Sequence, residues 1–142
     1  MNYLINKHTS KVYNYHPYTK NKLKILVDYL IEECGNKANL NDIDTSAIKD
    51  MSFLFNNLQF DGDISNWDVS NVTYMRWMFN NSSFNGDISS WDVSNVEDMY
   101  YMFKHSKFNR DISNWDVNNV KDMGNMFNCC PLQNNPPSWY KQ

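Results

Sequence analysis

The chain has 142 residues, of which 42% are hydrophobic and 15% aromatic, so it is long enough to bury one sizeable core. Its formal net charge is −3 at pH 7, which excludes the basic surplus that nucleic-acid binding requires. No apolar run reaches the roughly 18 residues that a membrane span needs, so we expect no membrane insertion.

Residues 1–39 predict an N-terminal hairpin and a capping helix. Strand-forming residues at 3–5 and 12–15 flank the polar turn NKHTS, and Pro17 ends the second strand. Thr19 is a suitable N-cap for a helix at about 20–34, and Gly35 suits its C-terminal end. The helix is expected to bury one apolar stripe, formed by Leu23, Leu26, Val27, Leu30, Ile31 and Cys34.

A 24-residue repeat dominates the rest of the chain. The stretch DISNWDVSNV begins at Asp63 and returns with small changes at Asp87 and Asp111, and 12 of the 24 positions are identical in three successive units. A degenerate unit precedes them and a partial one follows, as is usual for the end caps of a stacked array. The units run at about 36–59, 60–83, 84–107 and 108–131, and a partial cap occupies 132–142.

Each unit predicts a short extended segment, at about 63–69 in the first full unit, and a short helix at about 71–80. Ser70, Ser94 and Asn118 lie at the expected N-cap positions. We therefore expect an α/β fold, a right-handed leucine-rich-repeat-like solenoid at 40–142 that forms a single folded unit with residues 1–39. Its core columns are predicted to be Trp67, Trp91, Trp115, Met75, Met99, Met123, Phe79, Phe103 and Phe127.

Units of the form F-x-x-D-I-S-x-W-D-V-S-N-V-x-x-M-x-x-M-F closely resemble the BspA-type leucine-rich-repeat family of bacteria. The resemblance covers residues 40–130 nearly continuously, and residues 16–31 with 41–55 resemble the N-terminal module of such proteins. Many members are large surface proteins or lipoproteins of host-associated bacteria that are implicated in adhesion. The resemblance implies a leucine-rich-repeat fold and a role in binding other proteins.

The aspartate columns raise the alternative of a calcium site. Calcium-binding repeats bring several oxygens together beside paired glycines. Here each full unit has a single glycine position beside these aspartates, which holds Gly62, Gly86 and, in the third unit, Arg110. Aspartates that bond local backbone N–H groups in turns explain the columns more simply. We therefore expect no metal and no cofactor. The three histidines are scattered, and no nucleophile elbow or phosphate loop occurs, so we expect no enzyme.

The positions that the repeat leaves free are the candidates for recognition. Aromatic residues and an arginine lie there where packing does not demand them, and such residues are enriched in protein–protein hot spots. The alternative is that Trp77, Tyr101 and Phe53 simply pack between the helices of neighbouring units. The candidates are Tyr74, Arg76, Trp77, Tyr100 and Tyr101, with Tyr74 and Tyr100 expected to be exposed. An acidic rim of Glu97, Asp98 and Asp122 is expected to orient a basic partner.

These observations predict a non-enzymatic, monomeric protein-interaction module whose partner is another protein. Three cysteines, two of them adjacent, predict reduced thiols. The N-terminus lacks an export signal, so we expect a cytoplasmic protein if the chain is complete, although related proteins are often at the cell surface. The alternatives are a surface adhesin whose export signal is absent here and a calcium- or glycan-binding repeat protein.

Overall fold

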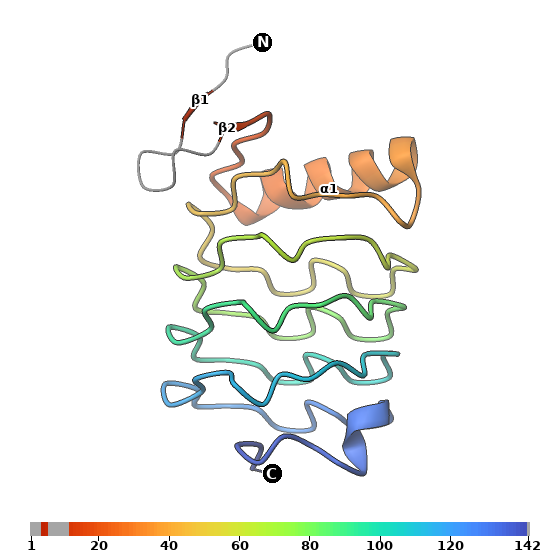
Figure 1. Ribbon diagram of the computed structural model, residues 1–142, viewed down its shortest axis with the longest axis vertical. Helices are drawn as coiled ribbons and strands as arrows, with labels where there is room; N and C mark the ends of the chain where they lie inside the picture. The colour runs from red at the N-terminus through yellow and green to blue at the C-terminus, as the bar shows by residue number, and fades with distance from the viewer. Residues whose placement is uncertain (1–3, 6–11, 142) are drawn as a thin grey trace.

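The structure is a computed structural model that describes residues 4–5 and 12–141 (Figure 1). Its elements are strands β1 (Leu4–Ile5) and β2 (Val12–Tyr13), helix α1 (Lys20–Cys34) and the 3-10 turn η1 (Pro131–Gln133). β1 and β2 pair antiparallel, with Leu4 opposite Tyr13. This confirms the described part of the predicted hairpin, while residue 3 and the turn at 6–10 lie outside the described residues.

Helix α1 begins and ends where the sequence predicts. The side chain of Thr19 accepts the Lys22 N–H at 3.2 Å, and Gly35, with φ 85°, donates its N–H to the Ile31 carbonyl at 2.8 Å. Leu23 and Val27 are fully buried in the common core, and α1 lies across one end of the stacked chain (Figure 1). Within the described residues, no helix is long and apolar enough to cross a membrane.

The 24-residue segments do not contain the strand and helix that the sequence predicts. Residues 36–130, all of which the structure describes, hold turns, bends and isolated parallel bridges, with no α-helix and no strand. Neither the extended segment at 63–69 nor the helix at 71–80 forms, and the Ser70, Ser94 and Asn118 helix caps are therefore wrong. The predicted α/β right-handed leucine-rich-repeat-like solenoid of strand–helix units is wrong.

The helix does not form because alternate backbone N–H groups of this stretch bond to the next segment and not within their own segment. The N–H groups of four alternate residues donate to carbonyl oxygens 23 residues further along the chain, at 2.8 to 3.0 Å: Met75, Trp77, Phe79 and Asn81. An α-helix would need these groups to bond four residues back. Trp77 and Asn81 also have left-handed φ values of 59° and 50°, which break any helix. The M-x-x-M-F spacing therefore reflects a series of tight turns that hydrogen-bonds to the next segment.

Tight turns also replace the predicted extended segment. Trp67 donates its N–H to the Ile64 carbonyl at 3.1 Å, and an Asp63 carboxylate oxygen accepts the Ser65 N–H at 3.0 Å. Short polar side chains that bond the backbone two residues on favour turns over strands. The apolar and polar alternation in D-I-S-x-W-D-V therefore reflects a turn whose apolar residues all point into the core.

The segments lie one above another along the long axis of the molecule (Figure 1), and their core side chains stack on equivalents in neighbouring segments. The indole N–H groups each donate to a carbonyl 27 residues earlier at 2.9 to 3.2 Å: Trp67, Trp91, Trp115 and Trp139. The rings of Phe55, Phe79, Phe103 and Phe127 stack with centroid distances of 5.4, 5.5 and 5.9 Å. Of the nine predicted core residues, all are buried except Met123, which is half-buried in the last full segment.

Candidate functional site

One surface position in each segment has a left-handed backbone, and in three segments it holds an aromatic residue. Phe53, Trp77 and Tyr101 have φ values of 65°, 59° and 57°, and Asn125 has 50° at the equivalent position. Bulky L residues are disfavoured in this region by about 1–2 kcal/mol, whereas Gly and Asn tolerate it. The second left-handed position, four residues on, holds Asn in the first two segments and His105 and Cys129 in the next two. Aromatic residues at the first position therefore carry a backbone cost that Asn would avoid.

We call Phe53, Trp77 and Tyr101 the aromatic column. The rings of Phe53 and Trp77 are stacked with centroids 5.9 Å apart, and those of Trp77 and Tyr101 meet edge to face at 4.5 Å. Each such pair contributes roughly 0.5–1.5 kcal/mol, which offsets part of the backbone cost. Phe53 nevertheless remains 43% exposed, and the other two rings are half-buried. The column therefore presents ordered aromatic surface to solvent.

Two tyrosines flank the column and widen it into what we call the aromatic surface. Tyr74, which lies at a parallel bridge between consecutive segments, is 47% exposed. Tyr100 is half-buried because its ring stacks on Tyr101 with centroids 3.9 Å apart, so the expected exposure of Tyr100 is wrong. A hydrogen bond with Tyr101 raises the pKa of the Tyr100 phenol above its ordinary value.

Cations lie against these rings. The Lys104 Nζ is 4.0 Å from the centroid of Tyr101 and 6.0 Å from that of Trp77, and the guanidinium carbon of Arg76 is 5.9 Å from the Tyr100 ring. Such contacts hold the charged groups over aromatic faces and stabilise exposed pairs by about 0.5–1 kcal/mol. The surface thus combines rings, a guanidinium and an ammonium in one place.

The structure brings four of the five sequence-predicted candidates into contact: Arg76, Trp77, Tyr100 and Tyr101. The fifth, Tyr74, lies three residues before Trp77 at a backbone bridge to Asp98. The candidate set omits Lys104, and it omits Phe53, for which packing between neighbouring units was the sequence interpretation. The signal for Phe53 was its position 24 residues before Trp77, in the degenerate first segment. Lys104 had no such signal, because its contact depends on how one flexible side chain lies over a ring of its own segment.

The acidic rim is largely paired within the chain. Glu97 accepts from Lys121 at 2.6 Å, and an Asp98 carboxylate oxygen lies 3.0 Å from the Arg76 Nε. Asp122 uses one carboxylate oxygen to accept the Gly124 N–H at 2.9 Å. The rim therefore offers less free negative charge to a basic partner than the sequence indicates.

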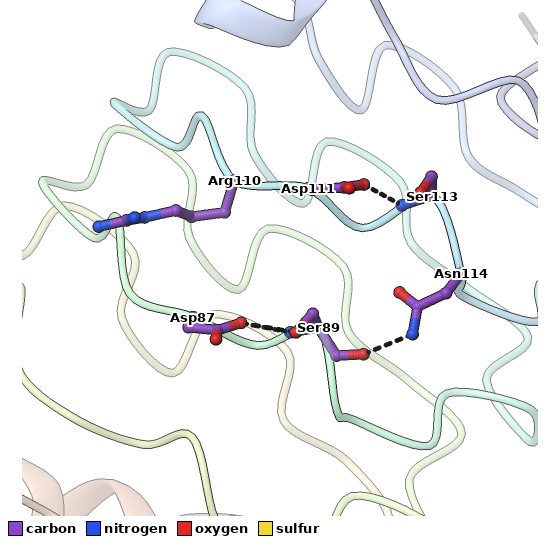
Figure 2. A pocket seen from close by; sticks show the side chains of 6 residues that line it. All are labelled: Asp87, Ser89, Arg110, Asp111, Ser113 and Asn114. Atoms are coloured by element: carbon purple, nitrogen blue, oxygen red, sulfur yellow. Dashed lines mark hydrogen bonds between the residues drawn. The ribbon is translucent and has the colours of Figure 1, made fainter.

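A shallow polar depression of about 450 Å³ lies between the turns that carry the aspartate column (Figure 2). It is lined by Asp87, Ser89, Arg110, Asp111, Ser113 and Asn114. One Asp87 oxygen accepts both the N–H and the hydroxyl of Ser89, at 3.0 and 2.7 Å, and Asp111 accepts the Ser113 N–H at 2.9 Å. The Arg110 side chain points away from Asp111 and donates to a backbone carbonyl at 2.7 Å.

The carboxylates of this column act on the backbone, as the sequence predicts. The hydrogen bonds from the serine two residues on hold the pKa of Asp63, Asp87 and Asp111 below the ordinary value. Among the described residues, no group of three or more His, Cys, Asp or Glu side chains is arranged to hold a metal ion. The depression is therefore built from turn-stabilising groups that already have partners.

Comparison with known proteins gives one match. A family described as a Mycoplasma protein of unknown function, DUF285, matches residues 27–139, and the chain belongs to this family. No curated protein and no solved structure matches the chain. The assignment to the BspA-type leucine-rich-repeat family is therefore wrong. Its motif spacing reflects apolar residues in stacked turns, without the strand and helix that define a leucine-rich repeat.

Proposed function

We propose that the chain is a non-enzymatic protein–protein interaction module that binds another protein through the aromatic surface. The observation that carries the proposal is the left-handed backbone of Phe53, Trp77 and Tyr101, beside an Asn at the equivalent position of the fourth segment. Asn125 demonstrates that the stack accepts the less strained residue there. Strained positions that keep costly side chains are typical of functional sites.

The chemistry of the surface supports a protein partner. Trp, Tyr and Arg dominate interface hot spots, because they supply large contact areas and hydrogen-bonding groups. Stacking already restrains the rings of Tyr100 and Tyr101, so less side-chain entropy is lost on binding. The exposed Tyr74 and Phe53 provide apolar area at the edge of this ordered group.

The test compares two double variants that remove side chains from different faces of neighbouring segments. Tyr74→Ala/Tyr100→Ala removes the flanking rings, and Asn66→Ala/Ser90→Ala removes two exposed polar side chains from other turns of two consecutive segments. Each variant and the parent are used as bait in extracts of the native cell, with quantitative mass spectrometry. We expect the tyrosine variant to capture at least about tenfold less of each protein that both the parent and the control capture. A tenfold loss corresponds to about 1.4 kcal/mol of binding free energy.

The tyrosine variant should remain folded. Its free energy of unfolding should fall by only about 1–2 kcal/mol, as surface substitutions that lose one ring contact do. Retention of the same partners by a folded tyrosine variant would contradict the proposal. Unfolding of this variant would show that the two tyrosines are packing residues.

The proposal treats the chain as a monomer that acts in a reducing compartment. Cys34, Cys129 and Cys130 do not form a disulfide, and their odd number leaves at least one thiol unpaired in any pairing scheme. An exported adhesin would encounter an oxidising environment, so fractionation of the native cell separates the two cases. Recovery of the protein on the cell surface would favour the adhesin.

A further inference from the structure

Helix α1 exposes apolar side chains on the side that faces away from the core. Leu23 and Val27 are fully buried on its inner side. On the opposite side, which we call the outer face, Ile25 and Tyr29 are 70% and 55% exposed. Residues four apart lie one above the other on a helix, so these two side chains form one apolar strip. The charges around the strip indicate what covers it.

The charges of α1 lie at the ends of the helix that disfavour them. Lys22 is in the first turn, and Glu32 and Glu33 are in the last turn, with no acid in the first turn and no base in the last. A helix dipole favours the reverse arrangement. The other two lysines of α1 are paired with aspartates at 3.3 and 2.6 Å. Among the described residues, Lys22, Glu32 and Glu33 have no ion-pair partner, so their placement is unexplained within the chain.

The outer face has a spacing that is symmetric about its middle. Its four side chains follow one another at steps of three, four and three residues: Lys22, Ile25, Tyr29 and Glu32. This is the spacing of the contact seam between two packed helices. Val27 lies midway along the helix both between Ile25 and Tyr29 and between Lys22 and Glu32. A second α1 that runs in the opposite direction therefore places its Tyr29 opposite Ile25.

The same antiparallel arrangement pairs the charges. Lys22 of each copy lies opposite Glu32 of the other, at both ends of the apolar strip. Lys22 then also lies beside the C-terminal end of the second helix, and Glu32 beside its N-terminal end, where each charge is favoured. A parallel arrangement would instead set Lys22 against Lys22 and Glu32 against Glu32, which like-charge repulsion disfavours. The face is thus self-complementary in one direction only, as a two-fold interface requires.

We propose that the outer face of α1 binds a second copy of this chain through an antiparallel pair of α1 helices. Because α1 lies across one end of the stacked segments, the two stacks extend away from each other, and the β1–β2 hairpins lie at opposite ends of the helix pair (Figure 1). A helix of 15 residues is about 22 Å long and about 10–12 Å wide. Two such helices bury far less than a standard interface, which covers about 800 Å² per partner, so the association is reversible.

This association leaves the aromatic surface free. That surface lies on the stacked segments, whereas the outer face lies on the far side of α1. Each monomer therefore remains the unit that binds the partner of the proposed function. A reversible pair presents two aromatic surfaces at once, which favours a partner that carries more than one copy of its own binding site.

The test measures the monomer–dimer equilibrium by sedimentation over a range of protein concentrations up to about 1 mM. The parent should dimerise reversibly. Lys22→Glu and Glu32→Lys should each weaken dimerisation at least about tenfold, because each change creates two contacts between like charges. An equimolar mixture of the two variants should associate about as tightly as the parent, because every charge then faces an opposite charge on the other variant.

Three controls accompany the mixing experiment. Lys107→Glu makes the same charge change on an exposed turn of the third segment and should dimerise like the parent. Circular dichroism should show both α1 variants folded, since each new charge suits its end of the helix. Tyr74→Ala/Tyr100→Ala should also dimerise like the parent, so the two proposals fail separately.

Three results would overturn the inference. The first is a parent that stays monomeric at about 1 mM. The second is dimerisation of both single variants as tight as that of the parent. The third is a mixture that associates no more tightly than its components.

Discussion

Two aromatic columns run through the same segments at the same 24-residue spacing, but they differ in burial and backbone strain. Trp67, Trp91 and Trp115 are each 4% exposed, and each indole has a carbonyl partner. The column of Phe53, Trp77 and Tyr101 lies at the surface on left-handed backbone. Packing and a carbonyl partner account for the first column, whereas the second combines exposed ring contacts with a backbone conformation that Asn tolerates better.

The difference extends to the residue types. The buried column repeats one residue in every full segment, because each Trp meets the same neighbours and the same carbonyl. The surface column changes from Phe to Trp to Tyr to Asn along the stack. A position that varies among segments of equal geometry is not fixed by the stack, which makes it a candidate for recognition.

The largest expected effect is in the buried column. Trp91 has a Trp-bearing segment on each side, and Trp91→Ala should lower the free energy of unfolding by about 3–5 kcal/mol. Trp139, which is half-buried against Trp115 and Phe127, should lose only about 1–2 kcal/mol on the same change. Urea unfolding of both variants checks this order. Equal losses would show that the column is not packed from both sides.

Acid should weaken the turns of the aspartate columns by a smaller amount. Four of these aspartates have their pKa lowered from 3.8 by hydrogen bonds from the serine two residues on. The serine N–H has the larger effect at Asp63 and Asp87. The serine hydroxyl has the larger effect at Asp92 and Asp111. Because the folded pKa lies below the unfolded one, this stabilisation is complete above the unfolded pKa and is lost as pH falls through the folded pKa. The urea midpoint should therefore be similar at pH 7 and 5 and fall below about pH 4. A midpoint that rises on acidification would contradict these turn contacts.

Removal of divalent metal should have no effect. Asp87 and Asp111 line the polar depression, and one carboxylate oxygen of each already accepts a hydrogen bond, from Ser89 and Ser113 respectively. The melting temperature followed by circular dichroism should be unchanged by EDTA and by added calcium. A shift of about ten degrees, which for a domain of this size corresponds to roughly 2–4 kcal/mol, would restore the calcium hypothesis.

Local signals made helix α1 predictable, and their absence made the segments unpredictable. Thr19 and Gly35 mark the ends of α1 through contacts within four residues of the chain. In the segments, the decisive bonds join residues 23 apart, and the left-handed residues that break the helix include Trp77, a residue type with no preference for that conformation. An M-x-x-M-F pattern cannot distinguish a helix from turns bonded three residues back.

The candidate site was predictable to the extent that the repeat itself defines it. Tyr74 and Trp77 were found because the repeat leaves their positions variable, and stacking brings equivalent positions together. Only the structure shows the left-handed backbone of the aromatic column and the stacking that half-buries Tyr100, since neither has a signal in the sequence. The pairing of Glu97 with Lys121 was likewise hidden, because it depends on side chains from two segments.

The central claim is that the surface column serves recognition, and the triple variant Phe53→Asn/Trp77→Asn/Tyr101→Asn tests it most directly. It places the residue type of the fourth segment at all four equivalent positions. The decisive measurement is capture of the parent's partners by this variant, with urea unfolding run on the same preparation. We predict a folded protein, within about 2 kcal/mol of the parent because relieved strain offsets lost ring contacts, that no longer captures them. A folded variant that still captures them, or a loss of stability as large as that of Trp91→Ala, would contradict the claim.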